Sequence, residues 1–481
     1  MSTTTVILVT LLLYKALLIG IGFWASRRTH DEDDFFLGGR SLGPVVAAVS
    51  YSSSASSAFT LLGISGIAYT MGVGALWIAA GSVIGMLVAW YWIAPRLMHV
   101  SREKRLVTLT DLLLGDMRGS ARRALLWLAS LVIVISFSVY VAAQFQGAAS
   151  TFASSFGMSM PASIVTGAAI IMFYTLLGGF WAVSVTDTVQ GLLMAATAVL
   201  LPVTALTAVG GWEGFLAQLG EVSSASQLSW RAGNAGLAGV GFVLGLLCVG
   251  IGTYGQPHLL VRFMALRDDR AMRQARILTI IWYLLVFCGM CFVGLVGHIL
   301  FPVIDDPEQI FFILTENLFS PVVGAMLIAA VLSAIMSTAD SQLLVAASAI
   351  AHDLGLGRGS AARSLLVSRL SIVALVVLAV LIALFLPEKI FSRVLFAWIA
   401  LGSAFGPLVF ARLANWPVKD SASLLSVLLG FSSAVALYLA PNTPGDIAER
   451  LIPFCLAALC LVLGQSSVSS NHGRQSGKHL P

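Results

Sequence analysis

Long apolar stretches, separated by short polar connections, divide the whole chain of 481 residues. A helix needs about 20 apolar residues to cross a bilayer. Only 10% of the residues are charged, far fewer than in a typical soluble domain. The sequence therefore predicts an all-α polytopic membrane protein with about 13 transmembrane helices and no soluble domain. The predicted spans are roughly 5–26, 43–68, 73–98, 124–151, 161–179, 184–209, 236–257, 274–300, 320–350, 365–386, 390–411, 421–440 and 448–466.

Lysine and arginine are divided unequally between the two sides of the predicted membrane. With the N-terminus outside, the inward connections hold 22 of these residues and the outward connections hold 4. The inward count includes five residues from Arg262 to Arg276. Because positive charge concentrates in cytoplasmic loops, we expect an outside N-terminus and a cytoplasmic C-terminus in the cell inner membrane. The net charge of +5 then reflects topology. We expect a lipid bilayer around the chain and no nucleic-acid partner.

The ninth span contains polar groups that a lipid-facing helix would not carry. Its run Met336–Leu344 includes Thr338 and Asp340. An aspartate at the bilayer centre costs about 2.5–3.5 kcal/mol on insertion scales and usually marks a functional site. Three serines spaced four residues apart share one helix face. Hydroxyls and a carboxylate are hard oxygen ligands that suit a small hard cation, so the run indicates an ion-coupled membrane protein. The serines are Ser333, Ser337 and Ser341.

Two spans are interrupted in the middle. Ser50–Ser57 breaks the second span, and Val249–His258 breaks the seventh. Serine-rich spans can also be tight helix contacts, but paired breaks in two halves of a transporter mark its binding site. Five spans separate the breaks, which predicts two inverted repeats. The predicted division is 1–42 for the first helix and a cytoplasmic loop, 43–209 and 236–411 for the repeats, 412–466 for two peripheral helices, and 467–481 for a disordered cytoplasmic tail.

Several short stretches resemble motifs of the sodium:solute symporter family, and among its members those of the bacterial sodium/proline branch. They are Phe36–Leu42, Gly178–Leu193, Gly255–Met264, and Met336–Leu344 with the following Ile350–Leu354. The resemblance implies a LeuT-type 5+5 inverted-repeat core with discontinuous helices 2 and 7. It also implies Na⁺-coupled symport of a small organic solute into the cell, proline or another amino acid, with no enzymatic activity.

The same resemblance implies a Na⁺ site between the second and ninth spans. Its ligands would be the backbone carbonyls of Ser53, Ser56 and Ala334 and the side-chain oxygens of Ser337 and Thr338. The residues themselves agree with this site, because the break in span 2 frees carbonyls and span 9 presents hydroxyls. Five neutral oxygens would hold a monovalent ion weakly enough to release it.

A second Na⁺ site, found in some family members, would use four residues. They are Asp187, Ser337, Asp340 and Ser341. Two other interpretations remain open for the carboxylates. Asp187 could cap a helix or pair with a nearby arginine, and Asp340 could pair with a cation or accept backbone donors. Proton coupling through either aspartate is a further alternative.

The solute is expected beside the two breaks, where the family places aromatic residues. The candidate substrate-binding residues are Ser57, Phe59, Tyr140, Gln144, Thr253, Tyr254 and Gln256. Four positions depart from the sodium/proline branch. Ala55 and Phe59 stand where that branch has an aspartate and a tryptophan, and Val249 and Thr253 stand where it has a tryptophan and a tyrosine.

These departures leave the solute open. The alternatives are Na⁺-coupled uptake of an organic acid or other non-amino-acid solute, and a transporter-like solute sensor. Sensors of that kind usually carry a cytoplasmic signalling domain, and about 15 residues follow the last predicted span. The five cysteines lie in apolar spans without a metal-binding pattern, so we expect small buried hydrophobic residues there. We expect the protein to function as a monomer.

Overall fold

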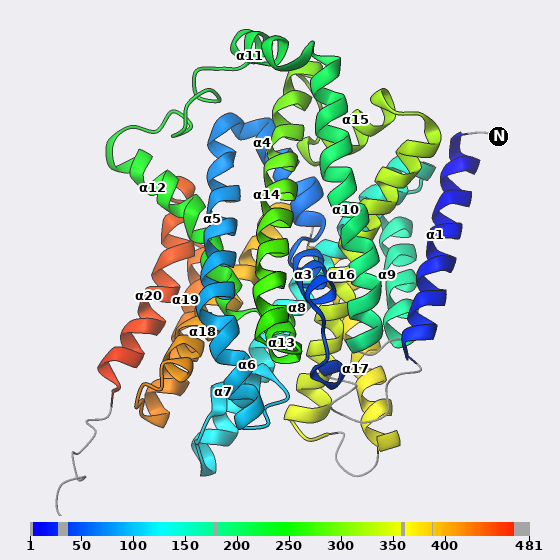
Figure 1. Cartoon of the computed structure of the whole chain (residues 1–481). Coiled ribbons are helices and arrows are strands. Elements are labelled where there is room, and N and C mark those ends of the chain that lie inside the picture. The colour runs from blue at the N-terminus through cyan, green and yellow to red at the C-terminus, as the bar shows by residue number, and fades with distance from the viewer. Residues whose placement is uncertain (1–2, 27–36, 178–179, 357–360, 387, 466–481) are drawn as a thin grey trace, which may run out of the picture.

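The chain folds into a bundle of helices that run mostly in the same direction, with α11 lying across one end (Figure 1). The computed structural model describes residues 3–26, 37–177, 180–356, 361–386 and 388–465. The helices of the first half are α1 (Thr3–Ser26), η1 (Gly38–Arg40), α3 (Pro44–Ala55), η2 (Phe59–Gly63), α4 (Ile64–Met71), η3 (Gly72–Ala75), α5 (Leu76–Val88), η4 (Ala89–Ile93), α6 (Ala94–Glu103), α7 (Leu109–Leu114), α8 (Gly119–Phe156), α9 (Met160–Leu177) and α10 (Phe180–Ala208). Those of the second half are α11 (Gly211–Val222), α12 (Gly236–Leu247), η5 (Cys248–Gly255), α13 (Pro257–Ala265), α14 (Asp269–Leu300), η6 (Pro307–Gln309), α15 (Ile310–Leu318), α16 (Pro321–Ser348), η7 (Ala349–Asp353), α17 (Ala361–Phe385), α18 (Ile390–Leu413), α19 (Asp420–Tyr438), η8 (Pro444–Asp446) and α20 (Ile447–Leu463).

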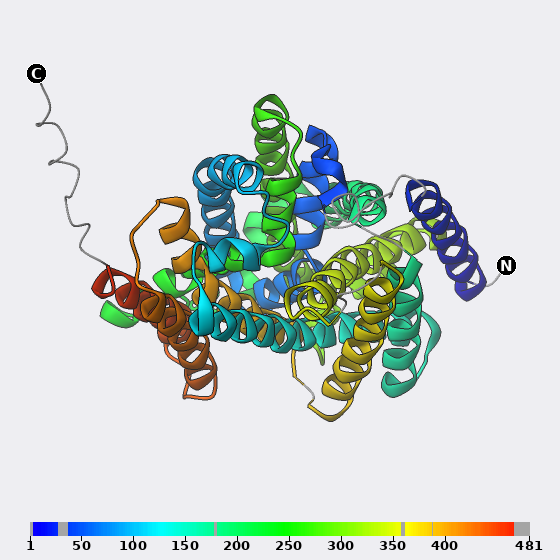
Figure 2. The same ribbon diagram turned by 90° about the horizontal axis from the view of Figure 1, so that it is seen from below.

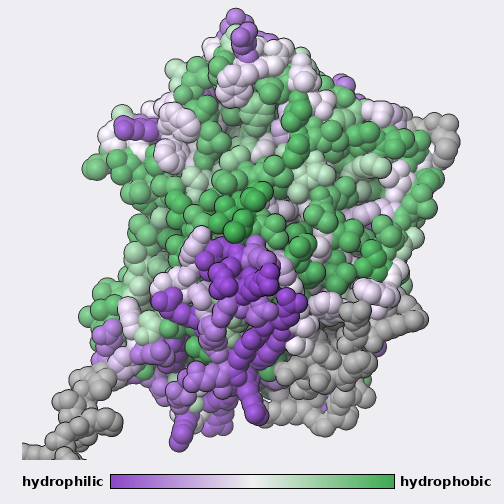
Figure 3. Space-filling view, viewed as in Figure 1, coloured by the Kyte–Doolittle hydropathy of each residue, from purple (hydrophilic) through white to green (hydrophobic). Residues whose placement is uncertain are grey.

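Each of the thirteen apolar stretches falls on one or more of these helices, which confirms the all-α polytopic prediction. Within the described ranges, ten helical stretches are long and apolar enough to cross a membrane. The space-filling view shows a broad apolar band around the bundle and a polar surface at one end (Figure 3). The helices at this polar end include α6 and α7. A bilayer would therefore surround the apolar band.

The predicted breaks in spans 2 and 7 are both confirmed. In span 2, α3 ends at Ala55 and Ser56 is extended (φ −108°, ψ 93°), after which the helix resumes at Phe59 with a π-helical turn. In span 7, α12 passes into the 3₁₀ segment η5, and Gln256 is extended (φ −82°, ψ 104°). Pro257 then begins α13, because proline suits the first turn of a helix, where no N–H partner is needed.

A close backbone contact seats the second break against α5. A Cβ atom on Gly250 would lie only 2.2 Å from the carbonyl oxygen of Gly81. Only glycine can occupy this position, because any side chain would overlap the neighbouring backbone. The Gly-rich sequence of span 7 therefore both breaks the helix and lets the broken segment pack inside the bundle.

One element of the predicted charge distribution is wrong. Arg262 was assigned to a cytoplasmic connection, but α13 continues to Ala265 and the Arg262 side chain is only 1% exposed. The reason is the break itself, which turns the chain so that the second half of span 7 remains inside the bundle.

The outermost predicted spans lie at opposite edges of the bundle. Seen from below, α1 lies at one edge and α20 at the other (Figure 2). The predicted repeats occupy the space between them, and their boundaries remain a prediction. The predicted disordered tail, most of the first connection, Phe36 and the first two residues of Gly178–Leu193 lie outside the described residues.

Candidate ion and solute site

Hydroxyl groups of α16 face the carbonyl groups that the first break releases. The Ser337 hydroxyl oxygen lies 3.2 Å from the carbonyl oxygen of Ser53 and 3.2 Å from that of Ala334. The Thr338 hydroxyl donates to the carbonyl oxygen of Ser54 at 3.1 Å. All of these residues are buried. The site therefore concentrates neutral oxygen atoms between α3 and α16, two helices that are far apart in the sequence.

Four of the five predicted Na⁺ ligands take part in this oxygen cluster, and Ser56 lies at its edge. Ser56 is the extended residue after α3, and its own N–H donates to Ser52 and Ser53. Its hydroxyl oxygen is buried and has no hydrogen-bond partner among the residues that the structure describes. The carbonyl of Ser54 is an additional oxygen that the sequence did not single out.

A second polar cluster lies next to the first and is built around Asp187 on α10. Its carboxylate Oδ2 accepts from the hydroxyls of Ser50 at 2.9 Å and Ser54 at 3.0 Å. Nη2 of Arg262 lies 2.8 Å from the same oxygen. Both charged side chains are almost fully buried, with exposures of 0% and 1%. The structure therefore pairs Asp187 with an arginine, which is one of the interpretations that the sequence left open.

Asp187 does not cap a helix, because α10 begins at Phe180 and continues past it. The Ser341 hydroxyl lies 2.9 Å from Nη2 of Arg262. Two of the residues predicted for a second Na⁺ site, Asp187 and Ser341, thus both contact one guanidinium group.

Asp340 points to a different neighbour. Its Oδ1 accepts the backbone N–H of Ser341 at 2.7 Å, and its Oδ2 is buried without a described hydrogen-bond partner. Lys15 of α1 lies in the neighbourhood of this carboxylate. The Lys15 ammonium group also contacts the sulfur of Met336, one helical turn away on α16. The first helix thus brings a lysine side chain to the ninth span, beside Asp340.

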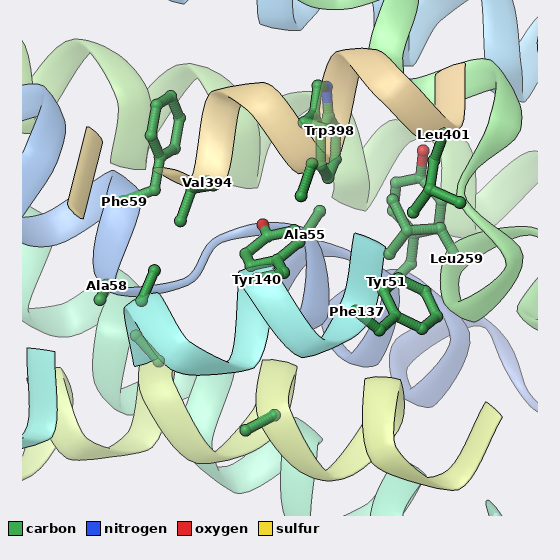
Figure 4. Close-up of a cluster of buried hydrophobic side chains, with 14 of the residues drawn as sticks. Tyr51, Ala55, Ala58, Phe59, Phe137, Tyr140, Leu259, Val394, Trp398 and Leu401 are labelled. Atoms are coloured by element: carbon green, nitrogen blue, oxygen red, sulfur yellow. The ribbon is translucent and has the colours of Figure 1, made fainter. Parts of the chain in front are cut away.

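A small cavity beside the first break forms a candidate solute site. Aromatic side chains from four elements line it, namely Phe59, Tyr140, Tyr283, Phe287 and Trp398. Figure 4 shows Tyr140 of α8 and Trp398 of α18 on either side of the broken segment that carries Ala55 and Phe59. The cavity volume is about 20 Å³, enough for about one water molecule. An organic solute therefore fits only after the surrounding side chains move apart.

Three of the seven predicted substrate residues line this cavity: Phe59, Tyr140 and Thr253. Ser57 lies beside them, since the Tyr140 hydroxyl lies 3.5 Å from its hydroxyl oxygen. Ala55 and Val249 also line the cavity. All four departures from the sodium/proline branch thus lie at the cavity surface.

Two other predicted substrate residues hold the backbone of the breaks. Gln144 accepts the N–H of Ala58 through Oε1 at 3.1 Å. Gln256 donates through Nε2 to the carbonyl oxygens of Gly252 and Trp398, both at 3.0 Å. Tyr254 packs instead against Phe410, with ring centroids 5.2 Å apart.

Sequence reasoning missed the lining residues from α14 and α18. Trp398 donates its indole N–H to the carbonyl oxygen of Val249 at 3.1 Å. A Cβ atom on Gly252 would lie 1.8 Å from Trp398 Cδ1, so this glycine makes room for the indole. A single aromatic residue in an apolar span is usually packing, and nothing local distinguishes Trp398 from the other tryptophans.

Polar contacts join neighbouring elements at two further places in the bundle. At one place, the Glu308 carboxylate accepts the N–H groups of Ile390 at 3.2 Å and Phe391 at 3.0 Å, which begin α18. The Phe391 ring stacks on Phe59 with centroids 5.3 Å apart. At the other place, the Thr108 hydroxyl donates to Asp353 at 3.2 Å.

Known proteins share this fold. A Na⁺-coupled sialic acid symporter, solved in a substrate-bound outward-open state, aligns with a TM-score of 0.79 at 18% identity and covers 95% of this chain and 97% of its own. Mhp1, a nucleobase-cation-symport-1 family transporter in a closed conformation, aligns with a TM-score of 0.57 at 13% identity over 90% of this chain and 96% of its own.

Relatives that the chain matches over most of their length are also similar in sequence. The osmoregulated proline transporter OpuE of Bacillus subtilis is 34% identical over 439 residues, which is 89% of this chain and 88% of the relative. The sodium/proline symporter of Salmonella typhimurium is 35% identical over 445 residues, with 89% and 87% covered. The model of the sodium:solute symporter family matches residues 35–430. The chain belongs to the sodium:solute symporter family.

Proposed function

We propose that the protein carries a small organic solute into the cell together with Na⁺, and that Na⁺ binds between α3 and α16. The observation that carries the proposal is the approach of the Ser337 and Thr338 hydroxyls to the carbonyl oxygens of the first break. These contacts join two helices that are some 280 residues apart in sequence. A Na⁺ ion there would be coordinated by the same oxygens from both helices, with the hydroxyl hydrogens turned away from the ion.

The chemistry of this oxygen set suits a weakly held monovalent cation. Hydroxyl and carbonyl oxygens are hard neutral ligands. The break leaves carbonyls without helical partners, which makes them available to an ion. Ser56 directly follows the end of α3, so its backbone carbonyl belongs to the same break. We therefore place Na⁺ at Ser53, Ser56, Ala334, Ser337 and Thr338, with the carbonyl of Ser54 beside them.

The cavity next to the ion supports a solute of modest size with a large apolar surface. Its described lining is mainly aromatic and aliphatic, with hydroxyls of Ser82, Thr253 and two tyrosines, and it contains no charged side chain. Two of the similar proteins, OpuE and the Salmonella typhimurium symporter, are named as proline transporters. Proline is therefore the first solute to test, followed by other amino acids and by organic acids, because Ala55 and Val249 change the cavity surface.

Coupling requires that Na⁺ and the solute favour the same conformation. Each ligand shifts the equilibrium only by its difference in affinity between states. Na⁺ at the end of α3 would fix the segment that leads to Phe59, which lines the cavity. The solute would then find its aromatic neighbours already positioned. We propose that a single chain performs this cycle, with the N-terminus outside and the polar end of α6 and α7 in the cytoplasm.

A thermal-shift screen separates the candidate functions. Purified protein in Na⁺, and again in K⁺, is heated with proline, other amino acids, organic acids and sugars. A solute that raises the melting temperature only in Na⁺ supports coupled binding. Uptake of that solute into proteoliposomes then separates a symporter from a sensor, because a sensor binds without flux. Uptake that follows pH and ignores Na⁺ would replace Na⁺ coupling by proton coupling.

A further inference from the structure

The guanidinium group of Arg262 lies in a cage of oxygen atoms from three helices. Nη2 lies 2.8 Å from Asp187 Oδ2 of α10, 2.6 Å from the Ser54 hydroxyl of α3 and 2.9 Å from the Ser341 hydroxyl of α16. Nε donates to the Ser50 hydroxyl at 2.9 Å. Nη1 donates to the carbonyl oxygen of His258 on its own helix. All three nitrogen atoms of the group are therefore held by buried oxygens.

The cage has the composition of a cation site, with one carboxylate and several hydroxyls. Its members Asp187 and Ser341 belong to the set predicted to hold a second Na⁺. A buried carboxylate is very costly without a positive partner, and the guanidinium supplies that charge. Since arginine keeps its proton in proteins, its charge remains in place throughout the pH range in which a cell lives.

The second carboxylate of the region, Asp340, has a lysine of α1 nearby. The Lys15 ammonium group contacts Met336, one helical turn before Asp340 on α16. The buried Asp187 carboxylate is thus matched by a buried cation that belongs to the chain. A Na⁺ ion added between Asp187 and Ser341 would meet this guanidinium at contact distance.

We infer that Arg262 is a resident cation that fills this cage, so that the protein couples each transported solute to a single Na⁺ ion. The inference rests on the proposed Na⁺ coupling. It assigns Arg262 a positioning role: the side chain holds α13 against α3, α10 and α16, and it occupies the place that a second coupling ion would need.

The number of Na⁺ ions bound per protein tests this role without knowledge of the solute. Equilibrium binding of ²²Na⁺ to purified protein in K⁺ buffer should saturate at one ion per chain with a Hill coefficient near 1. Arg262→Gln vacates the cage and leaves Asp187 without its partner, so binding should rise to two ions per chain. The double variant Asp187→Asn/Arg262→Gln removes both charges, and its binding should return to one ion.

A matched control uses another buried arginine. Arg450 of α20 is paired with Asp446 at 2.7 Å, at the edge of the bundle and outside the cage. Arg450→Gln should leave the count at one ion per chain. If Arg262→Gln does not fold, the wild-type count still tests the inference, because two ions bound by the wild type would overturn it.

Two ions bound by the wild type, with one of them lost in Asp187→Asn, would overturn the role of Arg262. A folded Arg262→Gln variant that still binds one ion would also overturn it, because the emptied cage would then hold no cation. No ²²Na⁺ binding by the wild type would instead overturn the proposed Na⁺ coupling. The two failures are therefore distinguishable.

Discussion

Trp398 donates its indole N–H to the carbonyl oxygen of Val249 at 3.1 Å and thereby joins α18 to the broken segment of span 7. Both residues line the cavity, so the bond sets the distance between two of its walls. Trp398→Phe keeps an aromatic ring but leaves the buried carbonyl without this donor, a change that costs about 1–3 kcal/mol. Thermal unfolding in detergent should show a clear drop in the melting temperature. Trp127→Phe is the control, because Trp127 is 60% exposed on α8 and its replacement should change little.

Gly252 is the second residue that the indole constrains. A methyl group at this position would overlap Trp398 Cδ1 at 1.8 Å, so Gly252→Ala should destabilise the protein by about 1–3 kcal/mol through overpacking. The smaller side chain of Trp398→Leu should recover part of that loss in the double variant. Gly20→Ala in α1 serves as the control, because a Cβ atom there meets nothing within 4 Å. A double variant less stable than Gly252→Ala alone would contradict the contact.

Variants of Thr338 test how much a single hydroxyl oxygen contributes to the ion site. Thr338→Val preserves the shape and removes the oxygen that faces Ser54, so the apparent Na⁺ affinity should fall at least tenfold, or about 1.4 kcal/mol. Thr338→Ser keeps the hydroxyl and should stay close to the wild type. The measurement is the Na⁺ dependence of the melting temperature. Equal loss in both variants would show that packing, and not the oxygen, is responsible.

Val249 tests whether the cavity is the solute site. The cavity is small, and Val249→Phe would fill it further, so solute-dependent stabilisation and uptake should be lost. Na⁺-dependent stabilisation should remain, because Val249 is not among the oxygens between α3 and α16. A variant that keeps solute binding would move the solute site elsewhere.

Glu308 should give the protein a specific dependence on pH. Burial raises the pKa of its carboxyl above the usual glutamate value. The N–H groups of Phe391 and Ile390 lower the pKa by a smaller amount. Of the nearby charges, Asp306 raises the pKa and Lys389 lowers it. The folded protein therefore holds this proton more tightly than the unfolded chain does. The contribution of Glu308 to stability falls as the pH rises from about 4.3 through the folded-state pKa.

Glu308→Gln removes this titration and keeps an oxygen that can accept an N–H from α18. The melting temperature of the wild type, measured against that of Glu308→Gln, should decrease as the pH rises through this window. A constant difference between the two proteins would show that Glu308 does not titrate there. Asp305→Asn, which changes a neighbouring acidic residue of the same connection, is the control.

The helices and breaks could be predicted because their causes are local in sequence. About 20 apolar residues suffice to define a span, and the serines of Ser50–Ser57 and the glycines before Pro257 interrupt two spans wherever the rest of the chain lies. The Ser337 and Thr338 hydroxyls could be assigned for the same reason, since their polarity stands out from an apolar helix.

The pairing of Asp187 with Arg262 could not be read from the sequence with the same certainty. The two residues are 75 positions apart, and Arg262 follows a break in span 7. The direction in which the chain leaves that break decides whether Arg262 lies inside the bundle or in a loop. Similarly, Tyr254 and Gln256 belong to the predicted break, but the turn of η5 directs Tyr254 to Phe410 and uses Gln256 to hold backbone carbonyls. The role of Trp398 could not be predicted from its local sequence, because it depends on Gly252 in another element.

Solute uptake into proteoliposomes under an imposed Na⁺ gradient tests the central claim most directly. The solute is the strongest hit of the thermal-shift screen, with proline tested first, and K⁺ replaces Na⁺ in the parallel sample. The wild type should accumulate the solute above its outside concentration only while the inward Na⁺ gradient lasts, and Ser337→Ala should lose that accumulation. Equal accumulation in K⁺, or accumulation that follows a pH gradient alone, would contradict Na⁺ coupling at the site between α3 and α16.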